Sequence, residues 1–540
     1  MKSHFRALAI AGSMILAATG LSALSGAVDA QAAGPLIKPT DHFPNGETPE
    51  TFQGPVGRAD CGPGSNPETS DLQGSVTVAD RESGRSSQGY RCNMALVGNY
   101  GTHSPLPFEG AEWQLARYKD SSGHQCAYYS QRMVNPVSEG VTQQRPGTVV
   151  VDVTNPADPK FSENLATPGM YDPWETLKVS EQRGLLAAVQ VGDGEAGSYM
   201  GIYSIKEDCR HPKMLFDGNI TAINHEGNFS HDGMTYYTGG LQPGIVSAID
   251  VTDPYHPKLL TTFFAKYGIH GCSTSVDGKR LYISHINEDW YYTLYAGKGG
   301  NGGKGVESTP SGPPPTNGDT ILGGNGFGIY DVSEIQERKP NPHVRLVSAL
   351  EYQDAQLGQH TLNFVKGGMP YAMEVSEAGH GGARIIDISD EKKPKVVTKL
   401  KTEIMMTANN DRATSETFRP GKETGGDLTF AYNTHYCNID KRVEPTMVAC
   451  SAFEQGLRLF DIRDLHHPKE LGYYNPGGDG TRQPGGWGGT YSGFVTAMPQ
   501  FDPEGKNIWF TDDDRGFFVV KPTNGTWISD VTEETVSHGV

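Results

Sequence analysis

Four histidines occupy equivalent positions in a pattern that repeats along this 540-residue chain. Each begins a His-x-x-Asn/Ser motif, and the motifs are His225-Glu226-Gly227-Asn228, His270-Gly271-Cys272-Ser273, His360-Thr361-Leu362-Asn363 and His435-Tyr436-Cys437-Asn438. Trp174 and Val495 hold the same position in the neighbouring repeats. Histidine is therefore not a general feature of the repeat, and the four side chains are candidates for one site.

Imidazole binds Fe, Cu, Zn and Ni, and a histidine set that leaves coordination positions open is typical of a catalytic metal site. We predict a transition-metal ion here, with Fe or Cu favoured and Zn or Mn as alternatives. The predicted ligands are His225, His270, His360 and His435. The residues predicted to orient these rings by hydrogen bonds are Asn228, Asn363 and Asn438. The alternative is that each histidine is a packing residue bonded to a backbone carbonyl.

Two further histidines lie in connections expected at the same end of the fold. His285 follows a second strand in one repeat, and His380 stands near Glu377 in the next. We predict that His285 and His380 serve in acid–base catalysis or substrate contact, whereas ordinary exposed loop histidines are the alternative. The connection after His285 is enlarged by a Gly- and Pro-rich insert, residues 297–328. We interpret this insert as a flap over the site or a disordered bulge.

Short strands must position these residues. An apolar phrase that ends in Asp and leads through a turn to Pro-Lys occurs seven times, in clear or weaker form. The clear copies begin at Thr148, Ile249, Ile385 and Leu459, and the weaker ones at Ile202, Ile329 and Phe517. Period-two alternation with β-branched residues predicts strands, and the Asn/Asp-Pro pairs predict tight turns. A further strand precedes most copies, so each unit is expected to hold three or four antiparallel strands, as in a propeller blade.

These phrases resemble the LVIVD-repeat family of secreted bacterial proteins, which is taken to form β-propellers. The resemblance covers about residues 148–522 and implies an all-β scaffold without implying a particular chemistry. Seven copies imply one seven-bladed ring over residues 76–530, with residues 76–100 joining the C-terminal strands to complete the last blade. An open array would leave sheet edges exposed. First strands line the central channel of a propeller, so the four histidines would converge at one mouth.

The N-terminus predicts export. Lys2 and Arg6 precede an apolar run over residues 7–24, and Ala30-Gln31-Ala32 is typical of a cleavage site. Residues 1–32 are therefore predicted to be a signal peptide, with an uncleaved membrane anchor as the alternative. We expect residues 33–75 to form an extension and residues 531–540 a tail. The mature protein is predicted to be secreted or periplasmic, with no membrane span.

An oxidising compartment favours disulfides among the seven cysteines. Cys437 and Cys450 stand on either side of an apparent strand–turn–strand and are predicted to form a bridge. The looser pairings are Cys61 with Cys92 and Cys126 with Cys209. One cysteine must remain, and the candidate is Cys272.

Composition excludes several classes of function. With 45 Lys and Arg against 63 Asp and Glu, the net charge is −18, which argues against nucleic-acid binding. The 68 Gly and 35 Pro residues disfavour a helical bundle. The sequence also lacks a phosphate-binding Gly-x-x-x-x-Gly-Lys-Ser/Thr loop and a Gly-x-Ser-x-Gly nucleophile elbow.

Two classes of function remain. The first is an exported metalloenzyme acting on a small-molecule or polymeric organic substrate, with an oxidoreductase or oxygenase preferred over a metal-assisted lyase. Its arrangement is similar to that of carotenoid-cleaving oxygenases, in which four propeller histidines hold iron, and to that of oligogalacturonate lyases, which hold manganese. The similarity is one of architecture only. The second is a non-enzymatic surface or periplasmic propeller that binds protein or polysaccharide.

Overall fold

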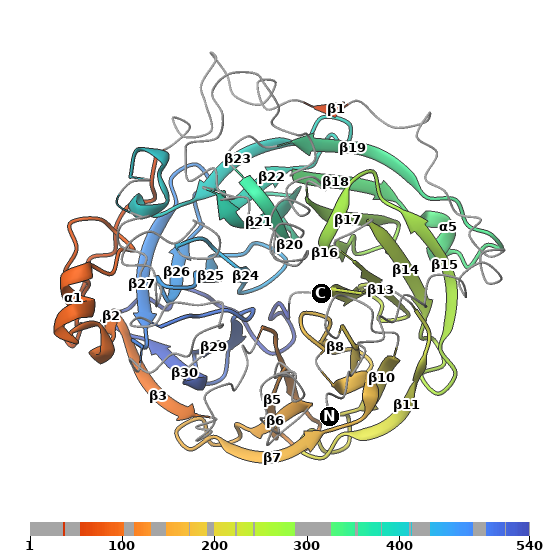
Figure 1. Cartoon of the computed structure of the whole chain (residues 1–540), viewed down its shortest axis with the longest axis horizontal. Helices are drawn as coiled ribbons and strands as arrows, with labels where there is room; N and C mark the ends of the chain where they lie inside the picture. The colour runs from red at the N-terminus through yellow and green to blue at the C-terminus, as the bar shows by residue number, and fades with distance from the viewer. Residues whose placement is uncertain are drawn as a thin grey trace, which may run out of the picture.

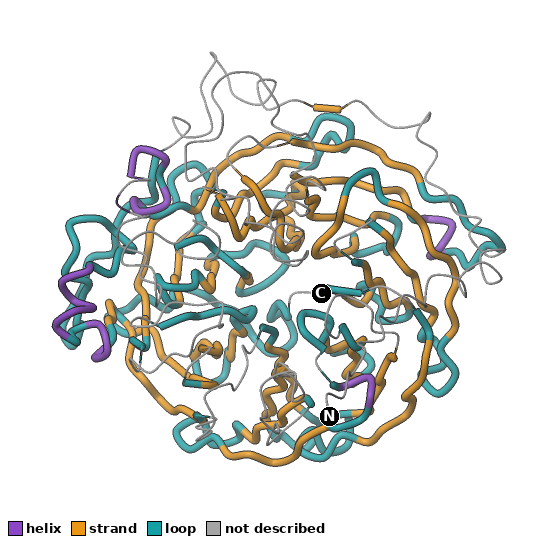
Figure 2. The backbone as a smooth tube through the Cα atoms, viewed as in Figure 1, coloured by secondary structure: helices purple, strands orange, loops and turns teal. Residues whose placement is uncertain are grey.

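The computed structural model describes residues 36–37, 54–101, 113–130, 147–171, 173–191, 199–221, 224–240, 244–286, 326–351, 355–379, 381–409, 412, 432–478, 493–512 and 515–538. These residues form antiparallel β-sheets with few helical turns, an all-β and propeller-like architecture (Figure 2). The helices are α1 (Val78–Ser83) and α5 (Ser333–Gln336). Short 3₁₀ turns span Ser86–Gln88, Pro168–Met170, Glu403–Met405 and Thr407–Asn409.

Three four-stranded sheets follow one another in sequence. The first contains β4 (Leu115–Lys119), β5 (Gln125–Ser130), β6 (Thr148–Asp152) and β7 (Lys160–Leu165). The second contains β8 (Lys178–Ser180), β9 (Leu185–Val189), β10 (Tyr199–Ser204) and β11 (Lys213–Asn219). The third contains β12 (Glu226–Phe229), β13 (Thr235–Gly239), β14 (Ile245–Asp250) and β15 (Lys258–Phe264).

A nine-stranded sheet then combines two such runs. One run contains β16 (Gly268–Thr274), β17 (Arg280–Ile286), β18 (Gly326–Asp331) and β19 (Arg345–Glu351), with β1 (Leu36–Ile37) parallel to β19. The other contains β20 (Ala355–Lys366), β21 (Met369–Gly379), β22 (Gly382–Asp387) and β23 (Lys395–Leu400). The two runs join where Ile286 of β17 pairs with Leu357 of β20.

The last two sheets each include a strand from the N-terminal region. One contains β24 (Tyr436–Ile439), β25 (Met447–Ser451), β26 (Leu457–Asp461), β27 (Lys469–Asn475) and β2 (Tyr90–Cys92). The other contains β28 (Gln500–Asp502), β29 (Asn507–Asp512), β30 (Gly516–Pro522) and β3 (Met94–Tyr100). Because β3 pairs antiparallel with β30, an N-terminal strand completes the sheet that holds the last copy of the repeat.

The sheets lie around a common centre, with β20 and β24 near it and β7, β15, β19 and β27 at the periphery (Figure 1). Neighbouring first strands contact one another: β4 contacts β28 and β8, β12 contacts β8 and β16, and β20 contacts β16 and β24. A side chain near the start of one of these inner strands is therefore close to its equivalents in adjacent sheets.

The repeated phrase forms the third strand of each run, namely β6, β10, β14, β18, β22, β26 and β30. Its terminal aspartate caps the turn that follows. Asp152, Asp250 and Asp387 each accept a hydrogen bond from the backbone N–H two residues on, at 2.8–2.9 Å. This Asx turn reverses the chain, and the fourth strand then begins at the Lys of Pro-Lys, as at Lys160 and Lys258.

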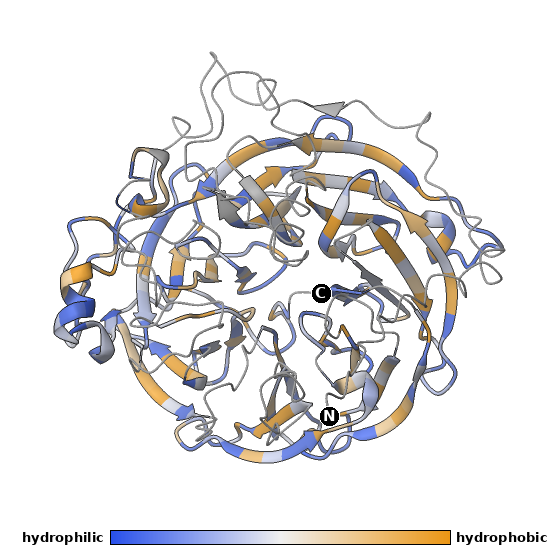
Figure 3. Cartoon of the chain, in the orientation of Figure 1, coloured by the Kyte–Doolittle hydropathy of each residue, from blue (hydrophilic) through white to orange (hydrophobic). Residues whose placement is uncertain are grey.

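The apolar core lies between adjacent sheets. Met373, Val375 and Ile385 pack with Val448 and Phe460 of the next sheet, for example. Figure 3 shows hydrophobic residues concentrated along the strands.

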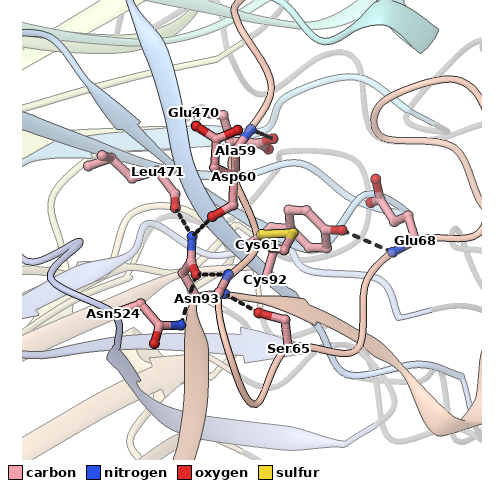
Figure 4. Close-up of a disulfide and its surroundings, with 12 residues drawn as sticks. Ala59, Asp60, Cys61, Ser65, Glu68, Cys92, Asn93, Glu470, Leu471 and Asn524 are labelled. Carbon is pink, nitrogen blue, oxygen red and sulfur yellow. Dashed lines mark hydrogen bonds between the residues drawn. A yellow bond between two sulfur atoms is a disulfide. The ribbon is translucent and has the colours of Figure 1, made fainter.

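Three disulfides join Cys61 to Cys92, Cys126 to Cys209 and Cys437 to Cys450, the pairs suggested by the sequence, and Cys272 is a free, buried thiol. Beside the Cys61–Cys92 bridge, Asn93 connects three segments (Figure 4). Its side chain accepts a hydrogen bond from Gly62 N–H at 2.8 Å and donates to Leu471 O at 2.9 Å, and Asn524 donates to it at 2.9 Å. Disulfides are typical of proteins in oxidising compartments such as the periplasm or cell exterior.

Two boundaries differ from the sequence predictions. β18 begins at Gly326, so residues 326–328 of the predicted insert are strand. Val531 and Val536, expected in a tail, are buried and pack in a core cluster with Phe501 and Phe518. The predicted signal peptide, residues 1–32, lies outside the described residues. Within the described part of the chain, no helix is both long enough and apolar enough to span a membrane.

Candidate metal centre

The four histidines of the repeated motif lie together at one end of the inner strands. His225 and His435 each stand one residue before a first strand, β12 and β24, whereas His270 lies on β16 and His360 on β20. The rings of His225 and His270 have centroids 4.5 Å apart. The shared position in the repeat thus corresponds to a shared position in space.

Two carboxylates join the histidines. Glu175, in the segment before β8, has one oxygen 3.2 Å from Nε2 of His225 and 3.5 Å from Nε2 of His270. Its other oxygen is 2.9 Å from Nε2 of His435. Glu377 of β21 lies 3.4 Å from Nε2 of His270 and 3.3 Å from Nε2 of His435. The two carboxylates thus link the Nε2 atoms of His225, His270 and His435, and the donor atoms of Glu175, His225 and His270 all lie within 4.8 Å of one another.

The Nδ1 atoms of three rings are bonded on the opposite side. Glu226 reaches Nδ1 of His270 at 3.1 Å and Nδ1 of His360 at 3.2 Å. The backbone carbonyl of Thr496 lies 2.7 Å from Nδ1 of His435. A partner at Nδ1 fixes the orientation of an imidazole and leaves Nε2 for a metal. Within the described residues, Nε2 of His360 is buried and has no hydrogen-bond partner.

The donor atoms of Glu175, His225 and His270 are close enough to bind a single ion. Ligands bound at about 2.1 Å lie roughly 3.0–3.4 Å from one another in tetrahedral or octahedral geometry. The contacts of Glu175 with His225, His270 and His435 fall between 2.9 and 3.5 Å. Glu175, His225 and His270 each offer one atom within 4.8 Å of the others. This trio has the two-histidine, one-carboxylate composition of non-haem iron sites.

Glu226 reaches two histidines because its neighbour strand carries a glycine. A Cβ atom at Gly271 would lie 2.4 Å from Oε2 of Glu226 and 2.6 Å from the carbonyl oxygen of Gln359. Any other residue would therefore collide with this carboxylate. On its far side, Lys178 Nζ lies 3.5 Å from Oε1 of Glu226. Three glutamates and one lysine leave a formal charge of −2 when the imidazoles are neutral, which one divalent cation would balance.

The carboxylates and the imidazoles shift one another's pKa values. Burial lowers the pKa of His435, but Glu175 and Glu377 outweigh it and raise that pKa to about 9. Burial also opposes protonation of His270, yet Glu175 and Glu226 hold its pKa well above the usual range. In the absence of a metal, protons on these rings take up part of the negative charge. At His360, burial prevails over Glu226 and lowers the pKa.

Access to this cluster is restricted. Glu175, His270, His360 and His435 are each at most 2 % exposed, whereas the side chain of His225 is 12 % exposed. Aromatic rings surround the cluster: Trp174 lies against His225 and stacks on Trp113, which contacts His435 edge-on. The more exposed rim of the site is therefore the side of His225 and Trp174.

The structure places His285 elsewhere. Its ring lies between Tyr267 and Tyr330 and its Nε2 is 3.0 Å from the Tyr330 hydroxyl. Burial, with a smaller effect of Lys266, lowers its pKa to about 3, so the ring is neutral at physiological pH. The acid–base or substrate-contacting role of His285 stays a prediction, and in the structure the residue is buried between two tyrosines. His380 lies outside the described residues.

The asparagines of the motif donate hydrogen bonds to backbone carbonyls. Asn228 donates to the carbonyl oxygen of Cys272 at 3.1 Å, and Asn363 donates to that of Thr274 at 2.6 Å. Asn438 donates to Pro499 O at 3.0 Å. Each bond crosses to a neighbouring run of strands, so these side chains connect the runs through backbone carbonyls, while Glu226 and the carbonyl of Thr496 contact the Nδ1 atoms of the histidines.

Sequence reasoning missed Glu175, Gln359 and Lys178 as members of the cluster. Gln359 donates to Oε1 of Glu175 at 2.6 Å and lies 2.7 Å from Nε2 of His435. One signal was present: Glu175 follows Trp174 in the repeat just as Glu226 follows His225, and the two glutamates form a parallel bridge. The residue that follows the histidine position in the repeat therefore also indicated a member of the cluster.

No protein-family model matches the chain, and no curated protein matches it significantly. Among solved structures, a chain of Kuenenia stuttgartiensis hydrazine synthase is 12 % identical with a TM-score of 0.44, and the match covers 78 % of this chain and 99 % of that one. A 6-phosphogluconolactonase-like protein from Bacteroides uniformis is 13 % identical with a TM-score of 0.45, covering 79 % and 98 %. A periplasmic gluconolactonase from Pseudomonas aeruginosa is 12 % identical with a TM-score of 0.42, covering 76 % and 96 %. Each of these similarities is distant.

Proposed function

We propose that this protein is an exported metalloenzyme built on a seven-bladed β-propeller of LVIVD-type repeats. Seven consecutive runs of strands, each with the repeated phrase as its third strand, support the blade count. The pairing of β3 with β30 supports closure of the ring by N- and C-terminal strands. The three disulfides support an oxidising compartment.

The observation that carries the proposal is the convergence of Nε2 atoms and carboxylate oxygens at one end of the ring. Glu175 alone meets three Nε2 atoms at 2.9–3.5 Å. Three glutamates and three of the four histidines are buried together, and buried charges cost free energy unless they are paired or bind metal. The proposed ligands come from His225, His270, His360 and His435, with Glu175 and Glu377.

The mixed donor set favours iron. An all-histidine site would suit copper and iron equally, but carboxylate oxygens are harder ligands, and two histidines with one carboxylate are typical of Fe(II) in oxygenases. We therefore place Fe first, with Mn and Zn as alternatives and Cu less favoured. The bound ion would supply redox or Lewis-acid chemistry for an organic substrate.

The chain's own residues have three tasks in this proposal. Glu226 and the carbonyl of Thr496 hold the imidazoles with Nε2 directed inward. Burial of Glu175 and Glu377 excludes water and strengthens their interaction with a cation. The partly exposed His225 marks the side from which a substrate reaches the site. An oxygenase or other oxidoreductase is the preferred activity.

Metal analysis of the full-length exported protein tests this proposal. We expect one equivalent of iron, a characteristic electron-resonance signal in the ferric state, and loss of the ion in His360→Ala and Glu175→Gln variants. His256→Ala is the matched control, since His256 is exposed and paired with Asp253 in a turn. A protein without bound metal that also fails to take up Fe²⁺, Mn²⁺, Zn²⁺ or Cu²⁺ would contradict the proposal and leave a buried ion-pair network.

Oxygen dependence separates the remaining activities. With iron bound, turnover of an organic substrate that requires O₂ supports an oxygenase, whereas turnover under anaerobic conditions supports a lyase. A metal-loaded protein that binds a protein or polysaccharide without altering it would favour a binding propeller.

A further inference from the structure

We infer that Trp174 and Trp113 form the substrate-binding wall of the metal centre and that this wall recognises a neutral, planar aromatic ring. The inference rests on the proposed function for the role of the metal. It concerns the substrate class, which the metal ligands leave open.

The backbone of Trp174 adopts a conformation that a bulky residue rarely occupies. Its φ is +49°, in the left-handed region, and Phe453, which packs on His435, has a φ of +42°. These are the only two aromatic residues among the described non-glycine residues with positive φ. Such conformations persist where the surrounding structure enforces them, and they concentrate at functional sites. Both lie beside the histidine cluster.

The two indoles lie between His225 and His435, the first and last of the four histidines in the chain. Trp174 occupies the repeat position that holds histidine in the next four runs, and Trp113 lies two residues before β4. Their rings stack at 5.0 Å with an interplanar angle of 18°. Trp174 lies 6.0 Å from His225, and Trp113 lies 5.0 Å from His435. The pair therefore spans from the first histidine to the last.

Stacking fixes the position of Trp174 and leaves part of it accessible. Trp113 is only 2 % exposed, so it acts as a rigid support, whereas Trp174 is partly exposed beside the partly exposed His225. A substrate that approaches on this side meets the indole before it meets the metal ligands. Indole rings bind other aromatic rings in offset or edge-to-face arrangements at centroid distances of about 4.5–7 Å.

The formal charge of the metal-loaded cluster favours an uncharged substrate. Glu175, Glu226, Glu377 and Lys178 sum to −2, and a divalent ion brings the cluster to neutrality. The described residues of the cluster contain no further cation to attract an anionic substrate. Recognition would thus rely on contact with the indole, which suits an uncharged aromatic compound such as a phenol.

Calorimetric titration of the metal-loaded full chain tests this inference. The probes are phenol and 2-naphthol, with cyclohexanol as the non-aromatic match for phenol. We expect both aromatic compounds to bind at least tenfold more tightly than cyclohexanol. Trp174→Gly should reduce their affinity at least tenfold with one metal ion retained, and Trp174→Phe should restore most of it. Glycine is chosen because it adopts a φ of +49° without strain, so the variant should fold.

Trp527→Leu is the control, because Trp527 packs against Phe501 in another cluster. Equal binding of 2-naphthol and cyclohexanol, absence of aromatic binding, or unchanged affinity in Trp174→Gly would overturn the inference. Its failure is distinct from failure of the proposed function. A metal-loaded protein that ignores aromatic probes refutes only the substrate class, whereas a metal-free protein refutes the metal centre and can still be titrated with 2-naphthol.

Discussion

The two ends of the inner strands are built from similar residue types but organise them differently. At the start of β12 and β24, histidine and glutamate side chains converge on one point. At the other end, charged residues that follow β8 and β24 pair with the C-terminal segment, residues 530–538. Lys441 pairs with Asp530, and His538 Nε2 lies 2.7 Å from Glu181. One end thus gathers possible metal-ligand atoms, whereas the other end holds separate pairs of charged side chains.

The C-terminal segment connects several sheets at this second end. Val536 forms a bridge with Lys441, Ser537 N–H donates to Asp440 O at 3.1 Å, and Asn438 donates to Ser537 O at 3.1 Å. Glu533 binds Arg117 of β4 through two contacts of 2.6 and 3.0 Å. A cavity of about 720 Å³ remains between this segment and the turns after β8, β12 and β24. These contacts identify the second end as a structural closure.

The difference indicates which buried charges serve stability and which serve function. At the C-terminal end the charges of Arg117 and Lys441 are paired within the chain, whereas Nη2 of Arg442 is buried without a hydrogen-bond partner among the described residues. At the histidine end, several carboxylates face several imidazoles, and Nε2 of His360 is buried without a partner among the described residues. The histidine end should therefore depend on a ligand that the chain does not supply.

Of the changes that distinguish the two ends, removal of the metal should change the stability of the protein most. An ion at 100 times its dissociation constant stabilises the folded state by about 2.7 kcal/mol. We expect treatment with a chelator to lower the melting temperature of the wild type and re-addition of Fe²⁺ to restore it. Glu175→Gln should abolish this difference, whereas Glu533→Gln at the other end should retain it. Calorimetric melting curves with and without metal provide the measurement, and equal shifts in both variants would contradict the distinction between the two ends.

Glu374, a buried carboxylic acid that belongs to neither end, should make the stability of the protein depend on pH. Burial outweighs Arg384 and raises the pKa of Glu374 to about 7 from a usual 4.5. The folded state then holds a proton that the unfolded state has lost between these values. The contribution of Glu374 to the free energy of unfolding is largest below pH of about 4.5. It falls by about 1.4 kcal/mol for each pH unit between about 4.5 and the pKa of the folded state, about 7.

Glu374→Gln removes this titration. Relative to the wild type, the variant should gain about 2 kcal/mol between pH of about 5 and about 7, measured by denaturant unfolding at each pH. Its metal content should be unchanged, because Glu374 bonds Ser284 and Arg384 rather than the histidines. A pH-independent difference would show that Glu374 is ionised throughout.

The ion pair of Arg117 with Glu533 should affect stability without affecting metal binding. Arg117 is fully buried, and removal of one partner of a buried pair costs up to several kcal/mol. Glu533 is 24 % exposed and Arg117 keeps Asp502 at 3.5 Å, so we expect a smaller loss, about 1.5 kcal/mol, for Glu533→Gln. Denaturant unfolding measures it, with Glu534→Gln as the neighbouring control. A loss of metal in Glu533→Gln would show that the two ends are coupled.

The sequence predicted the repeated strands and the meeting of the histidines for physical reasons. The terminal aspartate of the phrase is required by an Asx turn, as at Asp250, so the pattern reports local geometry. The histidines share one position in the repeat, and equivalent positions are adjacent in a ring of similar units. Both inferences need only the local pattern and its repetition.

The rest of the site depends on packing as well as on the repeat. Glu175 shares the repeat position of Glu226, but Glu377 comes from another position of its unit, and the fold brings Glu175 and Glu377 together at His435. The contacts of His285 and Asn228 could not be predicted, because the twist and pleat of a strand decide which way a side chain points. His285 faces Tyr330 within its sheet, and Asn228 reaches a carbonyl of the adjacent one.

The smallest expected effect comes from one added methyl group. Gly271 lies against Glu226, and a Cβ there would lie 2.4 Å from Oε2 and 2.6 Å from the carbonyl of Gln359. Because the backbone of Gln359 cannot move easily, the Glu226 carboxylate should shift and release His270 and His360 from their orientation. Loss of such an orienting contact typically weakens metal binding by 10- to 100-fold, and we expect about tenfold for Gly271→Ala.

Gly57→Ala is the matched control, because a Cβ there would meet only Lys469 Cγ at an ordinary 3.6 Å. Competition with a chromogenic chelator measures the affinity of both variants. Wild-type affinity in Gly271→Ala would mean that Glu226 does not orient the ligands. A tenfold loss with an unchanged melting temperature of the metal-free protein would show that the histidine end is arranged for the ion and not for the stability of the fold.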